Sequence, residues 1–298
     1  MQGRIKRGVA AAIALAAATA IAVGPAGASS AASPTPDAAV PKAAAPLQAF
    51  GILSDGKLMA AFKTDLPEEL NWVRRITGLV NDTVVIGIDF RVQDGKFYAV
   101  GNQGGIYTIS LPTPTVSDVV VTKVSQLSVG LNGTTFDVDF NPAADRLRVI
   151  SNTGQNLRHN LGNGATVSDY SLSSAPGAPA ITGVTAAAYT NNDLNGATST
   201  TLFDINTATA QVVVQSPANN GLLAPTGALG TSVGVNAGLD IFSKLSNGKT
   251  VSNSAFATLV LPNGDATLNT VDLLTGAATQ VGVFPLSVTD IALALDAS

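Results

Sequence analysis

The sequence predicts an all-β fold built from five copies of a four-stranded unit. Three observations support this prediction: a motif recurs about every fifty residues, short strand-like runs are separated by turn residues, and the strand missing from the incomplete first copy is found at the C-terminus. Internal periods of about 20 to 50 residues are the sequence signature of repeat architectures.

The recurring motif is an apolar run with an aspartate near its centre, first seen as IGIDF at residues 86–90. It returns as FDVDF at 136–140, VTAAAY at 184–189, AGLDIF at 237–242 and VTDIAL at 288–293. The aspartate positions of the five copies are Asp89, Asp139, Ala188 (an alanine in this copy), Asp240 and Asp290, separated by 50, 49, 52 and 50 residues. Five index positions indicate five units.

Each copy continues with further strand-like runs. In the first complete copy they cover residues 84–90, 97–100, 106–110 and 119–124, with Gly, Asp and Pro between them. In the second they cover 136–140, 146–151, 156–160 and 166–170, and in the last complete copy 239–242, 256–261, 267–272 and 278–283. Short alternating runs bounded by turn residues indicate antiparallel strands, so each copy is predicted to hold four.

The two ends of the chain complete one copy between them. Residues 50–53, 57–64 and 72–77 resemble the later strands of a copy, whereas the copy that starts at Val288 supplies one strand, about 288–295. A ring closed by strands from both ends is the arrangement of a β-propeller, and the sequence therefore predicts five four-stranded blades. A long β-sandwich, or a pair of them, stays open as the alternative.

The N-terminus predicts export. Arg4, Lys6 and Arg7 precede an Ala-rich apolar run and a small-x-small site ending at Ala28, so residues 1–28 read as a signal peptide. Residues 29–46 are rich in Ala, Pro and Ser and are expected to be a disordered leader. The predicted propeller domain is 47–298, and the protein is expected to be secreted. An uncleaved membrane anchor is the alternative for the first segment.

Charge and composition exclude several classes of protein. The net charge is −4, and loss of three basic residues with the signal peptide makes it −7 (13 basic minus 20 acidic). We therefore expect no nucleic-acid partner, because no basic stripe exists to contact phosphates. We expect no membrane span after cleavage and a monomeric protein. The chain has no cysteine, so neither disulfides nor thiolate metal sites support the fold.

The same residues resemble a known family. GIDFR, FDVDFNPAADRLRVISNTGQNLRHN and TLFDINTATAQVV are similar to an uncharacterised group of bacterial exported proteins known as domain of unknown function 4394, over about residues 47–295. The resemblance implies a propeller-like repeat fold. It implies no activity, so no catalytic residue is transferred.

The index aspartates are candidate metal ligands. If the first strand of each blade is innermost, Asp89, Asp139, Asp240 and Asp290 project toward a central channel and offer oxygen ligands to a divalent cation such as calcium. Asp137, two residues before Asp139, lies on the same strand face. The alternative is structural: each aspartate caps a turn or accepts backbone donors from the next blade.

A basic cluster is the second candidate site. Arg146 and Arg148 lie two residues apart on one strand face, and Arg158 follows on the next strand, with Gln155 close to it in the chain. Guanidinium groups bind carboxylate or phosphate in a bidentate manner, so these residues are candidates for ligand binding. The alternative is that the arginines pair with the index aspartates.

Three functions remain open from the sequence. The first is a non-catalytic module that binds an extracellular ligand or protein. The second is a glycoside hydrolase using Asp89, Asp139 and Asp240, because paired carboxylates need neither His nor Cys. The third is a structural envelope protein. A serine triad has only His159 as base, and this histidine is expected to be exposed.

Overall fold

The computed structural model describes residues 46–297, which form an all-β protein. The predicted signal peptide, and all of the predicted leader except its last residue, lie outside the described residues. Among residues 46–297, the only helix is a short 3-10 turn, η1 (Ala218–Asn220), and no helix has the length and apolar character that crossing a bilayer requires.

Twenty strands follow one another as five runs of four. The first three strands are β1 (Gln48–Leu53), β2 (Leu58–Lys63) and β3 (Leu66–Thr77). Next come β4 (Val85–Arg91), β5 (Lys96–Gly101), β6 (Gly105–Ser110) and β7 (Val119–Gln126). The second complete run is β8 (Phe136–Asn141), β9 (Arg146–Ser151), β10 (Asn156–Asn160) and β11 (Ala165–Ser168).

The remaining strands continue this order. The third run is β12 (Val184–Tyr189), β13 (Leu202–Asn206), β14 (Gln211–Gln215) and β15 (Leu223–Ala228). The fourth is β16 (Ala237–Ser246), β17 (Lys249–Val260), β18 (Ala266–Val271) and β19 (Ala278–Val283), and β20 (Val288–Leu293) is last. The predicted strands correspond to these elements, but β3 and β17 begin six and seven residues earlier than predicted.

The strands form four sheets, whereas the sequence predicted five. Three sheets have four strands each, and the fourth has eight in the order β20-β1-β2-β3-β7-β6-β5-β4. The eight-stranded sheet consists of two antiparallel runs joined by a short parallel pairing in which Ile76 lies opposite Val119 and Thr77 opposite Val120. The difference arises because the outermost strands of two neighbouring runs meet edge to edge.

The C-terminal strand completes the run of β1, β2 and β3, as expected. β20 pairs antiparallel with β1, with Phe50 opposite Ala292 and Gly51 opposite Ile291. A hydrogen bond from Ala294 N to Gln48 O, of 3.0 Å, extends the contact. The two ends of the described chain are therefore hydrogen-bonded in one sheet.

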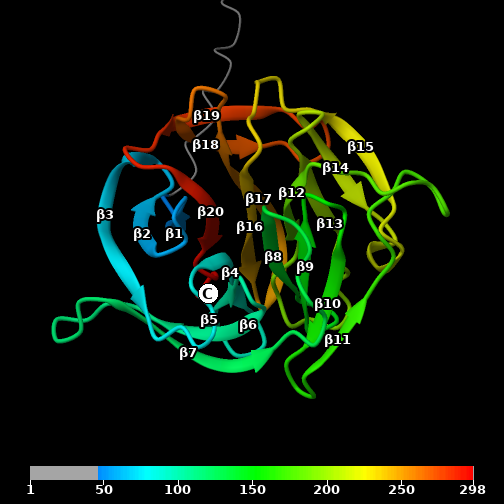
Figure 1. Ribbon diagram of the computed structural model, residues 1–298. Helices are drawn as coiled ribbons and strands as arrows, with labels where there is room; N and C mark the ends of the chain where they lie inside the picture. The colour runs from blue at the N-terminus through cyan, green and yellow to red at the C-terminus, as the bar shows by residue number, and fades with distance from the viewer. Residues whose placement is uncertain (1–45, 298) are drawn as a thin grey trace, which may run out of the picture. The chain divides into compact units, whose positions relative to one another are not determined.

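The first strands of the runs contact one another in a closed ring. β4 contacts β8, β8 contacts β12, β12 contacts β16, β16 contacts β20, and β20 contacts β4. We call these five the inner strands, and they lie nearest the centre of Figure 1. Each pairs with only one strand, the next outward in its own run, so its other edge faces the ring interior.

The hydrophobic core is divided among the interfaces between neighbouring runs. Because successive side chains of a strand point to opposite faces, one strand supplies two interfaces. On β13, for example, Leu202 packs in the cluster shared with the second run, whereas Phe203 and Ile205 pack toward the fourth. Burial of one such side chain contributes about 1.5–3 kcal/mol, and these interfaces fix the inner strands relative to one another.

Candidate functional site

The ring interior is where the inner strands present their unpaired backbone N–H groups. A strand edge with no neighbour carries donors that must find acceptors once water is excluded. Here the acceptors are aspartate side chains of the inner strands themselves. These aspartates are Asp89, Asp137, Asp139, Asp240 and Asp290, and all of them are buried.

Three aspartates form what we call the deep layer: Asp89, Asp139 and Asp240. Asp89 accepts the N–H of Phe90 on its own strand (2.6 Å) and that of Phe140 on the next (2.7 Å). Asp240 likewise accepts the N–H groups of Ile241 and Leu293, each at 2.5 Å. Asp139 accepts the N–H of Tyr189 at 3.2 Å. Three carboxyl groups therefore satisfy one amide from each of the five inner strands.

Two aspartates form the mouth layer, Asp137 and Asp290. Asp137 accepts from Val138 and Ala187, both at 2.8 Å, and Asp290 accepts from Ile88 at 2.9 Å and Ile291 at 2.8 Å. The structural alternative weighed for the index aspartates is thus observed, because each of them accepts a backbone donor from the neighbouring inner strand.

The sequence alignment of Asp290 with the other index positions was wrong by two residues. Asp89 accepts from the residue that follows Asp139, whereas Asp240 accepts from Leu293, which follows Ala292. Ala292 therefore occupies the deep-layer position of β20, and Asp290 lies in the mouth layer. A shift of two residues keeps the same side chains on the same strand face, so hydrophobic alternation cannot detect it.

Among the described residues, no aspartate side chain joins the neighbouring inner strands β12 and β16. In β12 the deep-layer position is Ala188, and the neighbouring contact is made by Asn192, whose N–H donates to Ser243 Oγ at 2.8 Å. The Asn192 side-chain amide donates to the Ile241 carbonyl at 3.3 Å. The amide of Asn192 thus makes the contact here that a carboxyl group makes between the other four pairs of neighbouring inner strands.

Burial makes the five carboxyl groups weak acids. It raises the pKa of Asp240 and Asp290 to about 7, and the pKa of the other three well above its ordinary range. The proximity of like charges adds to this: Asp240 raises the pKa of Asp89, and Asp89 raises that of Asp139. In the mouth layer, burial raises the pKa of Asp137, and the nearby charge of Asp290 adds to this.

The geometry of the deep layer also suits a cation. One carboxylate oxygen from each of Asp89, Asp139 and Asp240 lies within 4.8 Å of the others. Calcium–oxygen distances are about 2.3–2.6 Å, so oxygens around a single ion lie up to about 5.2 Å apart. Three of the four predicted metal ligands are therefore brought together, and Asp290 is not among them.

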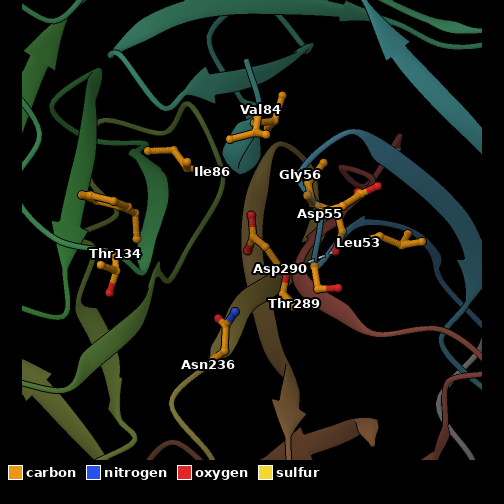
Figure 2. A pocket seen from close by; sticks show the side chains of 13 residues that line it. Leu53, Asp55, Gly56, Val84, Ile86, Thr134, Asn236, Thr289 and Asp290 are labelled. Carbon is orange, nitrogen blue, oxygen red and sulfur yellow. Dashed lines mark hydrogen bonds between the residues drawn. The ribbon is translucent and has the colours of Figure 1, made fainter. Parts of the chain in front are cut away.

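A pocket at one end of the ring opens onto the mouth layer, and we call it the mouth pocket. Figure 2 shows Asp290 among its lining residues, which come from the ends of several strands and include Leu53, Val84, Thr134 and Asn236. The pocket volume is about 160 Å³. Asp290 is 5% exposed and is the one inner-strand carboxyl group that lines it.

The predicted arginine cluster does not form as a single surface. Arg146 donates to the carbonyls of its own turn, Ala144 and Asp145. Gln155 bonds the backbone of the 130–132 segment through both ends of its amide. Arg148 and Arg158 do come together, through a carboxylate that was not among the predicted site residues. Asp169 accepts hydrogen bonds from Arg148 Nη1 at 2.7 Å and from Arg158 Nε at 2.8 Å.

Arg148 is a buried structural residue. It is 2% exposed and donates to the side-chain oxygens of Tyr189, Asn156 and Asn219 as well as to Asp169. Its pairing with the index aspartates, considered as an alternative, is not made. Asp169 directly follows β11, which pairs with β10, and its N–H donates to the Asn156 carbonyl at 2.9 Å, so the outer strand pairing brings its carboxylate to both arginines.

Two further buried groups were not anticipated. Asp204, on β13, is completely buried, and neither of its carboxylate oxygens has a hydrogen-bond partner among the described residues; burial raises its pKa well above the ordinary range. The available signal was a lone aspartate inside the apolar run LFDIN. His159 is also completely buried, between Ser125 and Thr166 at 2.9 Å each, so its predicted exposure was wrong.

These features define an all-β protein with a closed ring of inner strands and a carboxyl-lined interior. The chain belongs to the family described as domain of unknown function DUF4394, whose model matches residues 58–293. The resemblance inferred from the sequence is thereby confirmed. No curated protein matches the chain.

Several solved structures are similar to it at low sequence identity. A Bacteroides thetaiotaomicron structural genomics protein of unknown function is 12% identical, with 85% of this chain and 68% of that chain covered and a TM-score of 0.41. Myxococcus xanthus glutaminyl cyclase is 15% identical, with coverages of 72% and 83% and a TM-score of 0.42. Kuenenia stuttgartiensis hydrazine synthase is 9% identical, with a TM-score of 0.39; 70% of this chain is covered, and the match spans 51% of that chain.

Proposed function

We propose that the five runs of strands are the blades of a β-propeller and that the protein is an exported, non-catalytic binding module. The ring of inner strands, the division of the core among the interfaces between runs, and the β20–β1 pairing support the architecture. The N-terminal pattern of a basic segment, an apolar run and a small-x-small site supports export.

The proposed ligand is a divalent cation, with calcium as the first candidate. The observation that carries this proposal is the convergence of Asp89, Asp139 and Asp240, whose oxygens lie within 4.8 Å of one another. Oxygen-only ligands of this kind suit hard cations. The mouth pocket, with Asp290 between it and the deep layer, provides the entrance for the ion or for a ligand that reaches it.

A cation also resolves the electrostatic conflict of the deep layer. Three buried carboxyl groups at this separation cannot all ionise without compensation, and burial together with mutual repulsion raises their pKa values. A bound cation replaces the protons and lets the carboxylates keep their contacts with the backbone amides. Cation binding is thus expected to release protons and to strengthen as the pH rises.

The hydrolase alternative has less support. Asp89, Asp139 and Asp240 are each less than 5% exposed and accept hydrogen bonds from backbone amides, whereas a glycosidase needs both carboxyl groups at the substrate. Hydrolysis of a chromogenic sugar panel that is lost in the Asp89→Asn variant would favour the enzyme over the binding module. Absence of both hydrolysis and cation binding would favour a structural role.

The test of cation binding is a thermal shift. The wild-type protein, stripped with EDTA, is melted at pH 7.5 with and without calcium. At 100 times the dissociation constant we expect the melting temperature to rise by about 5–10 °C, because the folded state alone binds the ion. Asp139→Asn should lose most of this shift. Asp55→Asn, on the rim of the mouth pocket, is the control and should keep it.

The comparison is made within each variant, with and without calcium, so that changes in stability caused by the substitution cancel. Manganese and magnesium are tested in the same way to rank the metals. A wild-type protein that melts at the same temperature with and without all three ions contradicts the proposal.

A further inference from the structure

A second pocket lies away from the ring interior, between the segment that follows β11 and the segment around η1. Its volume is about 480 Å³. The residues that line it are Tyr170, Ser171, Ser173, Pro176, Gly177, Ala178, Asn220 and Leu222. None of them carries a formal charge. Tyr170, which is 75% exposed, is one of these lining residues.

The two walls of this pocket are fixed by the buried arginine described above. Arg148 donates from Nη1 to Asp169, next to Tyr170, and from Nη2 to Asn219, next to Asn220, at 2.7 and 2.8 Å. Asn156 repeats this bridge, since its amide donates to the carbonyls of Tyr170 and Ala218 at 3.0 and 3.1 Å. One pair of buried side chains thus sets the separation of the walls.

Backbone hydrogen bonds join the walls more closely. Ser173 N donates to Gly221 O at 2.8 Å, and Leu223 N donates to Ser173 O at 2.9 Å. A pocket held in this way is already formed without a ligand, which lowers the entropy lost on binding.

The groups that face the pocket indicate the chemistry of its ligand. Within residues 46–297, the hydroxyls of Tyr170 and Ser171 and the side-chain amide of Asn220 form no hydrogen bond, so they are free to bond a ligand. The adjacent residue in the chain, Asp169, has a side chain only 3% exposed and is paired with Arg148 and Arg158. The residues that line the pocket therefore offer no counter-charge to a charged ligand.

We propose that this pocket is a binding subsite for a neutral carbohydrate. A sugar ring presents an apolar C–H face, which packs on an exposed aromatic ring, and hydroxyls, which exchange hydrogen bonds with hydroxyl and amide groups. Tyr170 supplies the aromatic face, and Ser171 and Asn220 supply the polar groups. Arg148 and Asn156 are positioning residues, since they act through the pocket walls.

The experiment measures binding of three neutral saccharides, cellotriose, chitotriose and maltotriose, by saturation-transfer NMR and calorimetry. At least one should bind the wild-type protein. Tyr170→Ala should weaken that binding about tenfold, because a stacking contact of roughly 1.4 kcal/mol is lost. Tyr170→Phe keeps the ring and should weaken binding about threefold or less.

Val235→Ala is the matched control, since Val235 is 82% exposed and lies outside the pocket; this variant should bind like the wild type. The double variant Ser171→Ala with Asn220→Ala should weaken binding while leaving the melting temperature unchanged, because all its substitutions are on the surface. The proposal is overturned if no saccharide binds at about 10 mM, or if the Tyr170→Ala variant binds as well as the wild type.

Discussion

At the scale of single residues, the buried aspartates show how a few carboxyl groups support a whole ring. Each carboxyl group has two oxygens, and in Asp89, Asp137, Asp240 and Asp290 the two oxygens accept from two neighbouring strands. Five inner strands therefore need only two or three aspartates in each layer. This explains why some copies of the motif have no aspartate at the equivalent position.

The protonation of these groups makes stability depend on pH in an uncommon direction. Burial raises the pKa of Asp240 and Asp290 from 3.8 to about 7, so the folded protein keeps protons that the unfolded chain releases. Their contribution to stability is complete below about pH 4 and is lost as the pH rises to about 7. The raised pKa values of Asp89, Asp139 and Asp204 act in the same direction.

We therefore expect the EDTA-treated protein to be more stable at pH 5 than at pH 8. The loss of unfolding free energy should be about 2–3 kcal/mol for each of Asp240 and Asp290. Urea unfolding at the two pH values measures it, and the Asp290→Asn variant should show a smaller difference. Equal stability at both pH values would mean that these carboxyl groups titrate normally.

At the scale of strands, the sequence predicts what is local. Alternation and turn residues locate the four strands of the runs β4–β7, β8–β11 and β16–β19, because these signals depend on neighbouring residues alone. The register of Asp290 and the β3–β7 pairing were not predictable. The first is a two-residue shift that preserves the pattern, and the second depends on how the outer strands of two runs meet in space.

The candidate site divides in the same way. The aspartates that enter the ring interior could be identified because they recur with the repeat, and Asp137 because it is two residues from Asp139. The partners of Arg148 could not be identified, because Asp169 follows the last strand of the same run and Asn219 lies in η1 of the next run, and neither position recurs with the repeat.

The contact between β4 and β8 provides a test of the role of these carboxyl groups. Asp89→Ala leaves the N–H groups of Phe90 and Phe140 without their acceptor and should cost about 2–5 kcal/mol of unfolding free energy. Asp89→Asn keeps one carbonyl acceptor and should cost less. The unfolding free energies of the two variants are compared by urea unfolding at pH 5, because repulsion among the remaining carboxyl groups is weaker there than at pH 8.

The order of the two variants is the informative result. If Asp89→Asn is as destabilising as Asp89→Ala, the hydrogen bonds that Asp89 accepts from backbone N–H groups are not what holds β4 and β8 together.

At the scale of the whole molecule, one strand closes the ring. β20 carries Asp290 and pairs with β1. The N–H of its residue Leu293 donates a hydrogen bond to the Asp240 carboxyl group. Removal of β20 therefore breaks a sheet, two contacts of the ring interior and the apolar cluster around Ile291 and Leu293 at once.

A chain truncated after residue 287 is expected to lose cooperative thermal unfolding. A circular permutant in which residues 286–297 are joined by a short linker to residue 47 is the control, because the end of β20 already lies beside the start of β1, with Ala49 opposite Leu293. Calorimetry should show one sharp transition for the permutant and none for the truncated chain. A sharp transition in the truncated chain would mean that the ring does not depend on this closure.

The position of β20 after all the other strands has a consequence for biosynthesis. Ribosomes make proteins from the N-terminus, so the nascent polypeptide cannot pair β1 with β20 until β20 has left the ribosome. Until then the edge of β1 is open to other strands, and a prematurely terminated product would keep that edge open permanently, which makes such products candidates for aggregation or proteolysis.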